Sequence, residues 1–123
     1  MGKIFFIGIG GFLGAISRYS ISKLSMFIFG NNIPFGTFIV NVLGSFILGF
    51  FHTITVERIF LPDYLRFAFS VGFLGAFTTF STFSVETLMI FEDNAYIFGL
   101  LNIFANLFFS LLAAYLGIYL ARS

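Results

Sequence analysis

Hydroxyl side chains interrupt an apolar stretch in the middle of the chain, between Gly72 and Ser84. Its centre, at Phe77 and Thr78, is also the midpoint of the charge-poor stretch 65–90. Ser and Thr hydroxyls can replace the backbone hydrogen bonds that a broken helix loses inside a membrane. A break would leave free carbonyls, which attract a cation, followed by free N–H groups, which attract an anion. The alternative is an unbroken helix whose hydroxyls bond to the preceding turn.

Uncharged polar side chains also recur at a spacing of four residues in two other apolar stretches. The two sets are Thr37, Asn41 and Ser45, and Asn102, Asn106 and Ser110. This spacing places each set on one face of a helix. Such stripes can hold helices together by hydrogen bonds. They can equally line a water-exposed track, and because they carry no charge they suit an ion that must enter and leave again.

Two rings and two charges accompany the hydroxyl segment. Phe80 and Phe83 are three residues apart and share a helix face. Their ring edges carry positive partial charge that an anion could contact, although such pairs ordinarily serve packing. Glu86 and Arg18 are the deepest acid and base in the apolar stretches. Both can extend to the membrane surface, or they can mark the mouths of a pore.

The composition places these residues in a membrane protein. Of 123 residues, 59% are apolar and 9% are charged, against roughly 25% charged in an average soluble domain. The net charge of +1 without a Lys/Arg cluster argues against a nucleic-acid partner. The chain has no Cys and a single His, His52, so thiolate and histidine-cluster metal sites are excluded. No nucleophile–base pair in the apolar stretches indicates an enzyme.

Four stretches approach or exceed the roughly 20 apolar residues that cross a hydrocarbon core. They run over residues 4–29, 34–54, 65–90 and 96–121. We therefore predict an all-α integral membrane protein with one four-helix transmembrane domain over residues 1–123, in which the third helix is broken near mid-membrane. The first stretch also resembles a secretory signal peptide, but its small residues give it a packing face that a cleaved leader would not need.

Two further patterns concern symmetry. Four Lys/Arg residues fall on the side of the N-terminus and two on the other, a weak bias that is compatible with insertion in both orientations. The segment Gly11–Ala15, Gly-Phe-Leu-Gly-Ala, recurs at Gly72–Ala76. The repeat indicates either a two-helix duplication or a coincidence in a chain rich in Gly, Phe and Leu.

Three motifs spread over the chain form a set. They are Gly72-Phe-Leu-Gly-x-Phe-Thr-Thr-Phe-Ser-Thr-Phe83, Gly36-Thr37-x-x-Val40-Asn41-x-x-Gly44 and Gly11-x-x-Gly14-Ala15-x-x-Arg18-Tyr19. Together they resemble the Fluc (CrcB) family of fluoride channels, and the resemblance spans the whole chain. It implies a passive fluoride-selective channel that exports fluoride across the inner (plasma) membrane and so lowers cytoplasmic fluoride. It also implies an antiparallel, dual-topology homodimer with two pores.

The resemblance further implies roles for individual residues. Asn41 would donate its amide to fluoride, and Phe80 and Phe83 would present ring edges to it. Further pore residues would be Ser81, Thr82, Ser110 and Asn106, with Glu86 and Arg18 toward the pore ends. Main-chain carbonyls of Gly75 and Thr78 from both subunits would hold a structural Na⁺ at the dimer interface. The preference for fluoride over chloride rests on the resemblance alone.

Two other functions are compatible with a short four-span protein. A proton-coupled small multidrug transporter needs a carboxylate deep in the membrane, and residues 4–29 contain no acid. In a non-transporting membrane assembly subunit, the polar stripes would act only as contacts between helices.

Overall fold

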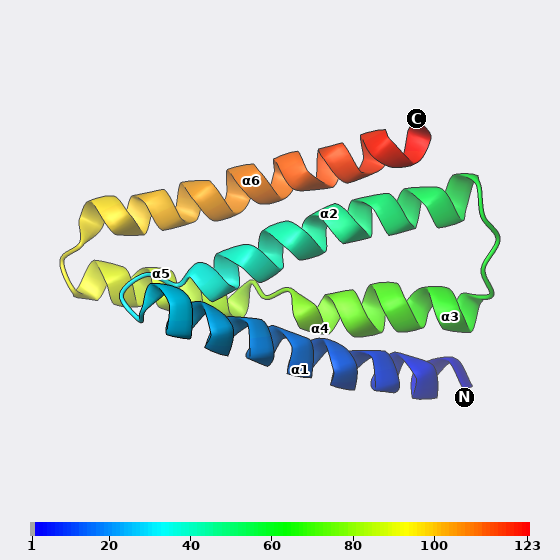
Figure 1. The fold of residues 1–123 in the computed structure, drawn as a ribbon, viewed down its shortest axis with the longest axis horizontal. Coiled ribbons are helices and arrows are strands. Elements are labelled where there is room, and N and C mark those ends of the chain that lie inside the picture. Colours follow the sequence, from blue (N-terminus) through cyan, green and yellow to red (C-terminus); the bar gives the residue numbers. More distant parts are fainter. Residues whose placement is uncertain (1) are drawn as a thin grey trace.

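Four long helices make up the computed structural model, which describes residues 2–123 (Figure 1). The helical segments are α1 (Gly2–Phe29), α2 (Phe35–Glu57), α3 (Asp63–Phe67), η1 (Ala68–Leu74), α4 (Gly75–Phe77), α5 (Ser81–Glu92) and α6 (Tyr96–Arg122). Segments α3, η1, α4 and α5 together form the third long helix. All four long helices are apolar and long enough to cross a membrane, which confirms the predicted all-α class with four candidate membrane helices.

The third long helix is interrupted close to its middle. α4 ends at Phe77 and α5 begins at Ser81, and between them Thr78 has an extended backbone with φ −89° and ψ 159°. The predicted interruption is therefore confirmed. The sequence did not indicate that η1 is π-helical. Single π-helical stretches often accompany functional sites, and here only the short α4 separates one from the break.

Ion pairs tie the helices together at one end of the bundle. Lys3 Nζ lies 4.0 Å from Asp63 Oδ2, and Arg122 Nη2 lies 2.8 Å from Glu57 Oε2. Both pairs are exposed, so each contributes little to stability. They place the described N-terminal end, the C-terminus and the α2–α3 connection at the same end of the bundle (Figure 1).

The helices associate in two pairs through small residues. α1 packs against η1 and α4, and α2 packs along α6. The backbone of Gly14 lies against that of Phe73, and Gly72 lies against Gly11, where an added Cβ at Gly72 would be 3.1 Å from the Gly11 nitrogen. The two Gly-Phe-Leu-Gly-Ala segments of the sequence therefore pack on each other. Close backbone approach at glycines is the usual way in which membrane helices associate.

A small apolar core joins α1, α2 and the third helix. It consists of Val40, Leu74 and Phe77, with Phe69 and Phe73 packed at its edge. The rings of Phe69, Phe73 and Phe77 stack at intervals of four residues, with centroid separations of 5.5 and 5.7 Å. This stack ends at the residue where α4 ends, so the apolar packing holds the first half of the third helix up to the break.

We expect Gly14→Ala to destabilise the protein. The new Cβ would lie 2.9 Å from the carbonyl carbon of Phe73, and overpacking of this kind costs about 1–3 kcal/mol. Thermal unfolding in detergent measures the change. The control is Gly8→Ala, because no atom lies within 4 Å of a Cβ there. Equal melting temperatures for the two variants would contradict the glycine-mediated packing.

Candidate functional site

The side chain of Asn41 on α2 holds the backbone at the break. The N–H of Thr79 donates to Asn41 Oδ1 over 2.8 Å, and Asn41 Nδ2 donates to the carbonyl of Thr79 over 3.0 Å. Because an N–H can only donate, the first bond fixes which end of the amide faces Thr79. Asn41 therefore pairs with both the N–H and the carbonyl of Thr79, in the way that a residue of a neighbouring β-strand would.

Two carbonyls lose their helical donors at the break. In a continuous helix the N–H of Thr79 would donate to the carbonyl of Gly75, four residues earlier, but it donates to Asn41. In the same way the N–H of Thr82 donates to Thr79 Oγ1 over 3.1 Å rather than to the carbonyl of Thr78. The carbonyls of Gly75 and Thr78 are thereby released from these helical bonds. Gly75 is also exposed on the surface of the chain.

Arg18 on α1 contacts the end of α4. Its Nε donates to the carbonyl of Ala76 over 3.0 Å. The family resemblance implies a place for Arg18 toward a pore end, and its contact in the structure lies within one turn of the break. A cation beside the last carbonyls of a helix is favourable because of the helix dipole. Arg18 therefore stabilises the terminus that the break creates.

The polar stripe of α6 continues from Asn41. Asn41 Nδ2 donates to Asn106 Oδ1 over 3.2 Å, and Asn106 Nδ2 donates to the carbonyl and to Oδ1 of Asn102 over 3.0 and 3.2 Å. Asn102 Nδ2 then donates to Thr87 Oγ1 over 2.8 Å. Both protons of the Asn41 amide are thus already donated within the protein. An anion that accepts one of them must replace Thr79 or Asn106.

A cavity of about 240 Å³ lies beside the break. Its lining includes the predicted site residues Asn41, Phe80, Phe83, Asn106 and Ser110, together with Ser45, Thr78, Thr79, Leu107 and Leu111. Among the described residues that line it, none carries a charge. Ser110 Oγ is buried and has no hydrogen-bond partner within residues 2–123. That hydroxyl is free to donate to a molecule or ion in the cavity.

The two phenylalanines differ in exposure. Phe80 is 71% exposed, whereas Phe83 is 6% exposed. Their ring centroids are 5.5 Å apart and the rings are tilted by 52°. Phe83 closes the inner wall of the cavity, while Phe80 stands at its outer rim. The large exposure of Phe80 leaves one side of the site open in a single chain.

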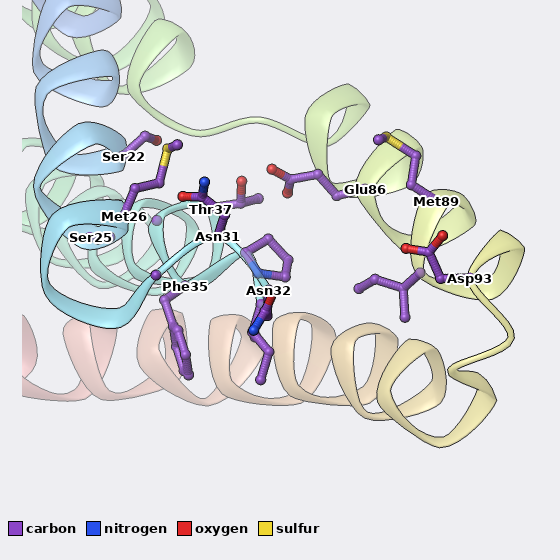
Figure 2. Close-up of a pocket in the computed structure, with 15 residues that line it drawn as sticks. Ser22, Ser25, Met26, Asn31, Asn32, Phe35, Thr37, Glu86, Met89 and Asp93 are labelled. Carbon is purple, nitrogen blue, oxygen red and sulfur yellow. The ribbon is translucent and has the colours of Figure 1, made fainter.

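A second cavity, of about 300 Å³, lies at the opposite end of the bundle from the ion pairs, among α1, α2 and α5 (Figure 2). Glu86 on α5 and Thr37 on α2 both point into it (Figure 2). Glu86 Oε1 is buried without a hydrogen-bond partner among the described residues. Thr37 and Asn41 are one turn apart on α2, and Phe83 and Glu86 are three residues apart on α5. The two cavities therefore follow each other along the same pair of helices.

Some of the predicted site residues do not line either cavity. Ser81 and Thr82 open α5 but are not among the residues that line either cavity. Ser45 and Asn102 lie on the polar stripes of the sequence without an assigned role, and Thr87 lies on neither stripe. No local pattern marks Thr87, because its importance comes from a partner on another helix.

Comparisons with known proteins agree on one family. Residues 5–118 match the model of the family described as CrcB-like protein, Camphor Resistance (CrcB). The chain is 46% identical over 122 residues to a fluoride-specific ion channel of Sulfurihydrogenibium, covering 99% of this chain and 98% of the relative. It is 45% identical over 120 residues to one of Dehalococcoides mccartyi, covering 98% and 92%. A channel of Magnetococcus marinus is 41% identical over 120 residues, covering 98% of each chain.

We expect Asn41→Leu to lower the free energy of unfolding by about 2–3 kcal/mol. The substitution leaves the partly buried N–H and carbonyl of Thr79 without protein partners, and an unsatisfied group costs about 1–3 kcal/mol when it is fully buried. Thermal unfolding in detergent measures the loss. Asn31→Leu, in the exposed α1–α2 connection, serves as the control. Unchanged stability of Asn41→Leu would show that the break does not depend on this side chain.

Proposed function

The chain belongs to the CrcB family, and from this premise we propose that it is a fluoride-specific ion channel of the cell membrane. The channel lets fluoride pass down its gradient and thereby lowers cytoplasmic fluoride. The family is one of channels, which agrees with the expectation that the chain is not an enzyme. The lack of any acid in α1 further disfavours a proton-coupled transporter.

The observation that carries the proposal is the uncharged cavity at the break. A small, strongly hydrated anion needs donors that replace its water, yet a fixed positive charge would bind it too tightly for passage. The unpaired Ser110 hydroxyl and the amide of Asn41 supply such donors, and the edge of Phe80 adds partial positive charge. Asn106 adds its amide to the same lining.

The route continues into the second cavity. Thr37 and Glu86 line it next to the first cavity, so fluoride passes from one to the other along α2 and α5. Ser81 and Thr82 extend the hydroxyl track at the start of α5, where Thr79 Oγ1 and Ser81 Oγ lie 3.4 Å apart. Glu86 marks the mouth at this end. Arg18 acts at the other side of the break through the carbonyl of Ala76.

The functional unit is an antiparallel homodimer with two pores. The exposure of Phe80 supports this arrangement, because a second subunit would close the open side of the site. The released carbonyls of Gly75 and Thr78 support a structural Na⁺ between the subunits, since carbonyl oxygens suit a hard cation. When bound, the ion supplies a positive charge that holds the four carbonyls of the two breaks together. The weak Lys/Arg bias is compatible with subunits in both orientations.

We expect purified protein in liposomes to release trapped fluoride passively and to retain chloride. A fluoride electrode and a chloride electrode measure the two effluxes from matched vesicles. The uncharged polar lining is the physical reason for passage without a fixed binding charge. Fluoride efflux no faster than that of protein-free liposomes would end the proposal, and equal fluoride and chloride efflux would remove its specificity.

We expect Phe80→Ile to slow fluoride efflux roughly tenfold, because the substitution removes the ring edge from the cavity. A contact of about 1.4 kcal/mol corresponds to that factor. Phe27→Ile is the matched control, since Phe27 is 88% exposed at the end of α1 and lies outside both cavities. Equal efflux for the two variants, with both proteins dimeric by size-exclusion chromatography, would remove Phe80 from the pore.

A further inference from the structure

A directed chain of hydrogen bonds begins and ends on the third long helix. It starts at the N–H of Thr79, passes through Asn41, Asn106 and Asn102, and reaches Thr87. The hydroxyl of Thr87 donates in turn to the carbonyl of Phe83 over 2.7 Å. This series of hydrogen bonds therefore leaves the third helix at the break, crosses α2 and α6, and returns to α5 two turns beyond the break.

Each member of this chain donates in the same direction. An amide side chain can be rotated by half a turn, which exchanges its donor and its acceptor, so its partners decide its orientation. The Thr87 hydroxyl gives its proton to Phe83 and can then only accept from Asn102. This sets the amide of Asn102, whose Oδ1 accepts from Asn106 Nδ2 beside the main-chain carbonyl of Asn102. Chains of hydrogen bonds that run in one direction also strengthen one another.

Asn106, in the middle of this hydrogen-bond chain, and Thr87, at its far end, are buried, so the loss of one bond there is not compensated by water. Thr87 is 5% exposed and Asn106 is 4% exposed, so bulk water does not replace a lost partner at these positions. α5 packs chiefly against α6 and makes few contacts with α2. The hydrogen-bond chain is therefore a main attachment between α5 and the helix that carries Asn41.

We propose that Thr87 and Asn102 are positioning residues that tie the hydrogen-bonded Asn106 and Asn41 side chains to α5 and thereby hold the break in its observed conformation. Neither side chain lines the cavity beside the break. Their effect on ion flux rests on the proposed function, whereas their effect on the break itself does not. Loss of the Thr87 hydroxyl leaves Asn102 Nδ2 without its acceptor and detaches the Asn102, Asn106 and Asn41 side chains from α5.

Hydrogen–deuterium exchange of the segment 78–84 in Thr87→Val tests this directly. Valine has the shape of threonine without the hydroxyl, and we expect the amide of Thr79 to exchange roughly tenfold faster. Thr55→Val is the matched control, because Thr55 Oγ1 donates to the carbonyl of Phe51 four residues earlier, as Thr87 does within α5. Thr55 has no side-chain partner on another helix among the described residues. Unchanged exchange in Thr87→Val, or an equal rise in both variants, would overturn the proposal.

Two further variants keep the test decisive if Thr87→Val does not fold. Thr87→Ser retains the hydroxyl and should exchange as the wild type does, whereas Asn102→Leu should raise exchange at Thr79 about as much as Thr87→Val. Faster exchange in Thr87→Ser, or wild-type exchange in Asn102→Leu, would contradict the proposed role of the hydrogen-bond chain. Fluoride efflux from the same proteins gives the second readout, with an expected loss of roughly fivefold or more in Asn102→Leu and none in Thr87→Ser. If the wild-type protein shows no fluoride efflux, the proposed channel function is refuted, but the result of the exchange experiment still decides the positioning role.

Discussion

Polar backbone groups that a break releases inside an apolar environment must find partners within the protein, because no water is there to bond them. In this chain the partners come from several directions. Asn41 on α2 takes both groups of Thr79, Arg18 on α1 takes the carbonyl of Ala76, and Thr79 caps the N–H of Thr82. Side chains of α1 and α2 therefore satisfy part of the interruption, whereas the carbonyls of Gly75 and Thr78 remain released from their helical bonds.

The same requirement separates two kinds of polar group at the site. The amides of Asn41, Asn102 and Asn106 have partners within the bundle. The Ser110 hydroxyl lies in the same cavity and has none within residues 2–123. In the proposed channel, an ion that enters meets one donor that is free and another that must first give up a protein acceptor. That competition weakens the hold of the site on the ion, which favours its release.

Much of this architecture could be predicted from the sequence, because it depends on local composition. Length and hydropathy predicted the four helices, and the hydroxyl run predicted the interruption that the structure has at Thr78. The four-residue spacing brought Asn106 and Ser110 to one face, and both line the cavity. The π-helical turn, the contact of Arg18 with Ala76 and the role of Thr87 could not be predicted in this way. Each depends on how two helices approach, and one sequence read along its length does not contain that information.

The two ends of the bundle differ, and this asymmetry has a consequence for transport. Exposed ion pairs lie at the end that carries the C-terminus, whereas the cavity with Glu86 lies at the other end. In the proposed antiparallel pair, each face of the membrane would receive one end of each kind, so the two faces would be chemically identical. The two pores then run in opposite senses, and any asymmetry of one is cancelled by the other. Such an assembly would conduct equally well in both directions, and the electrochemical gradient alone would set the direction of flow.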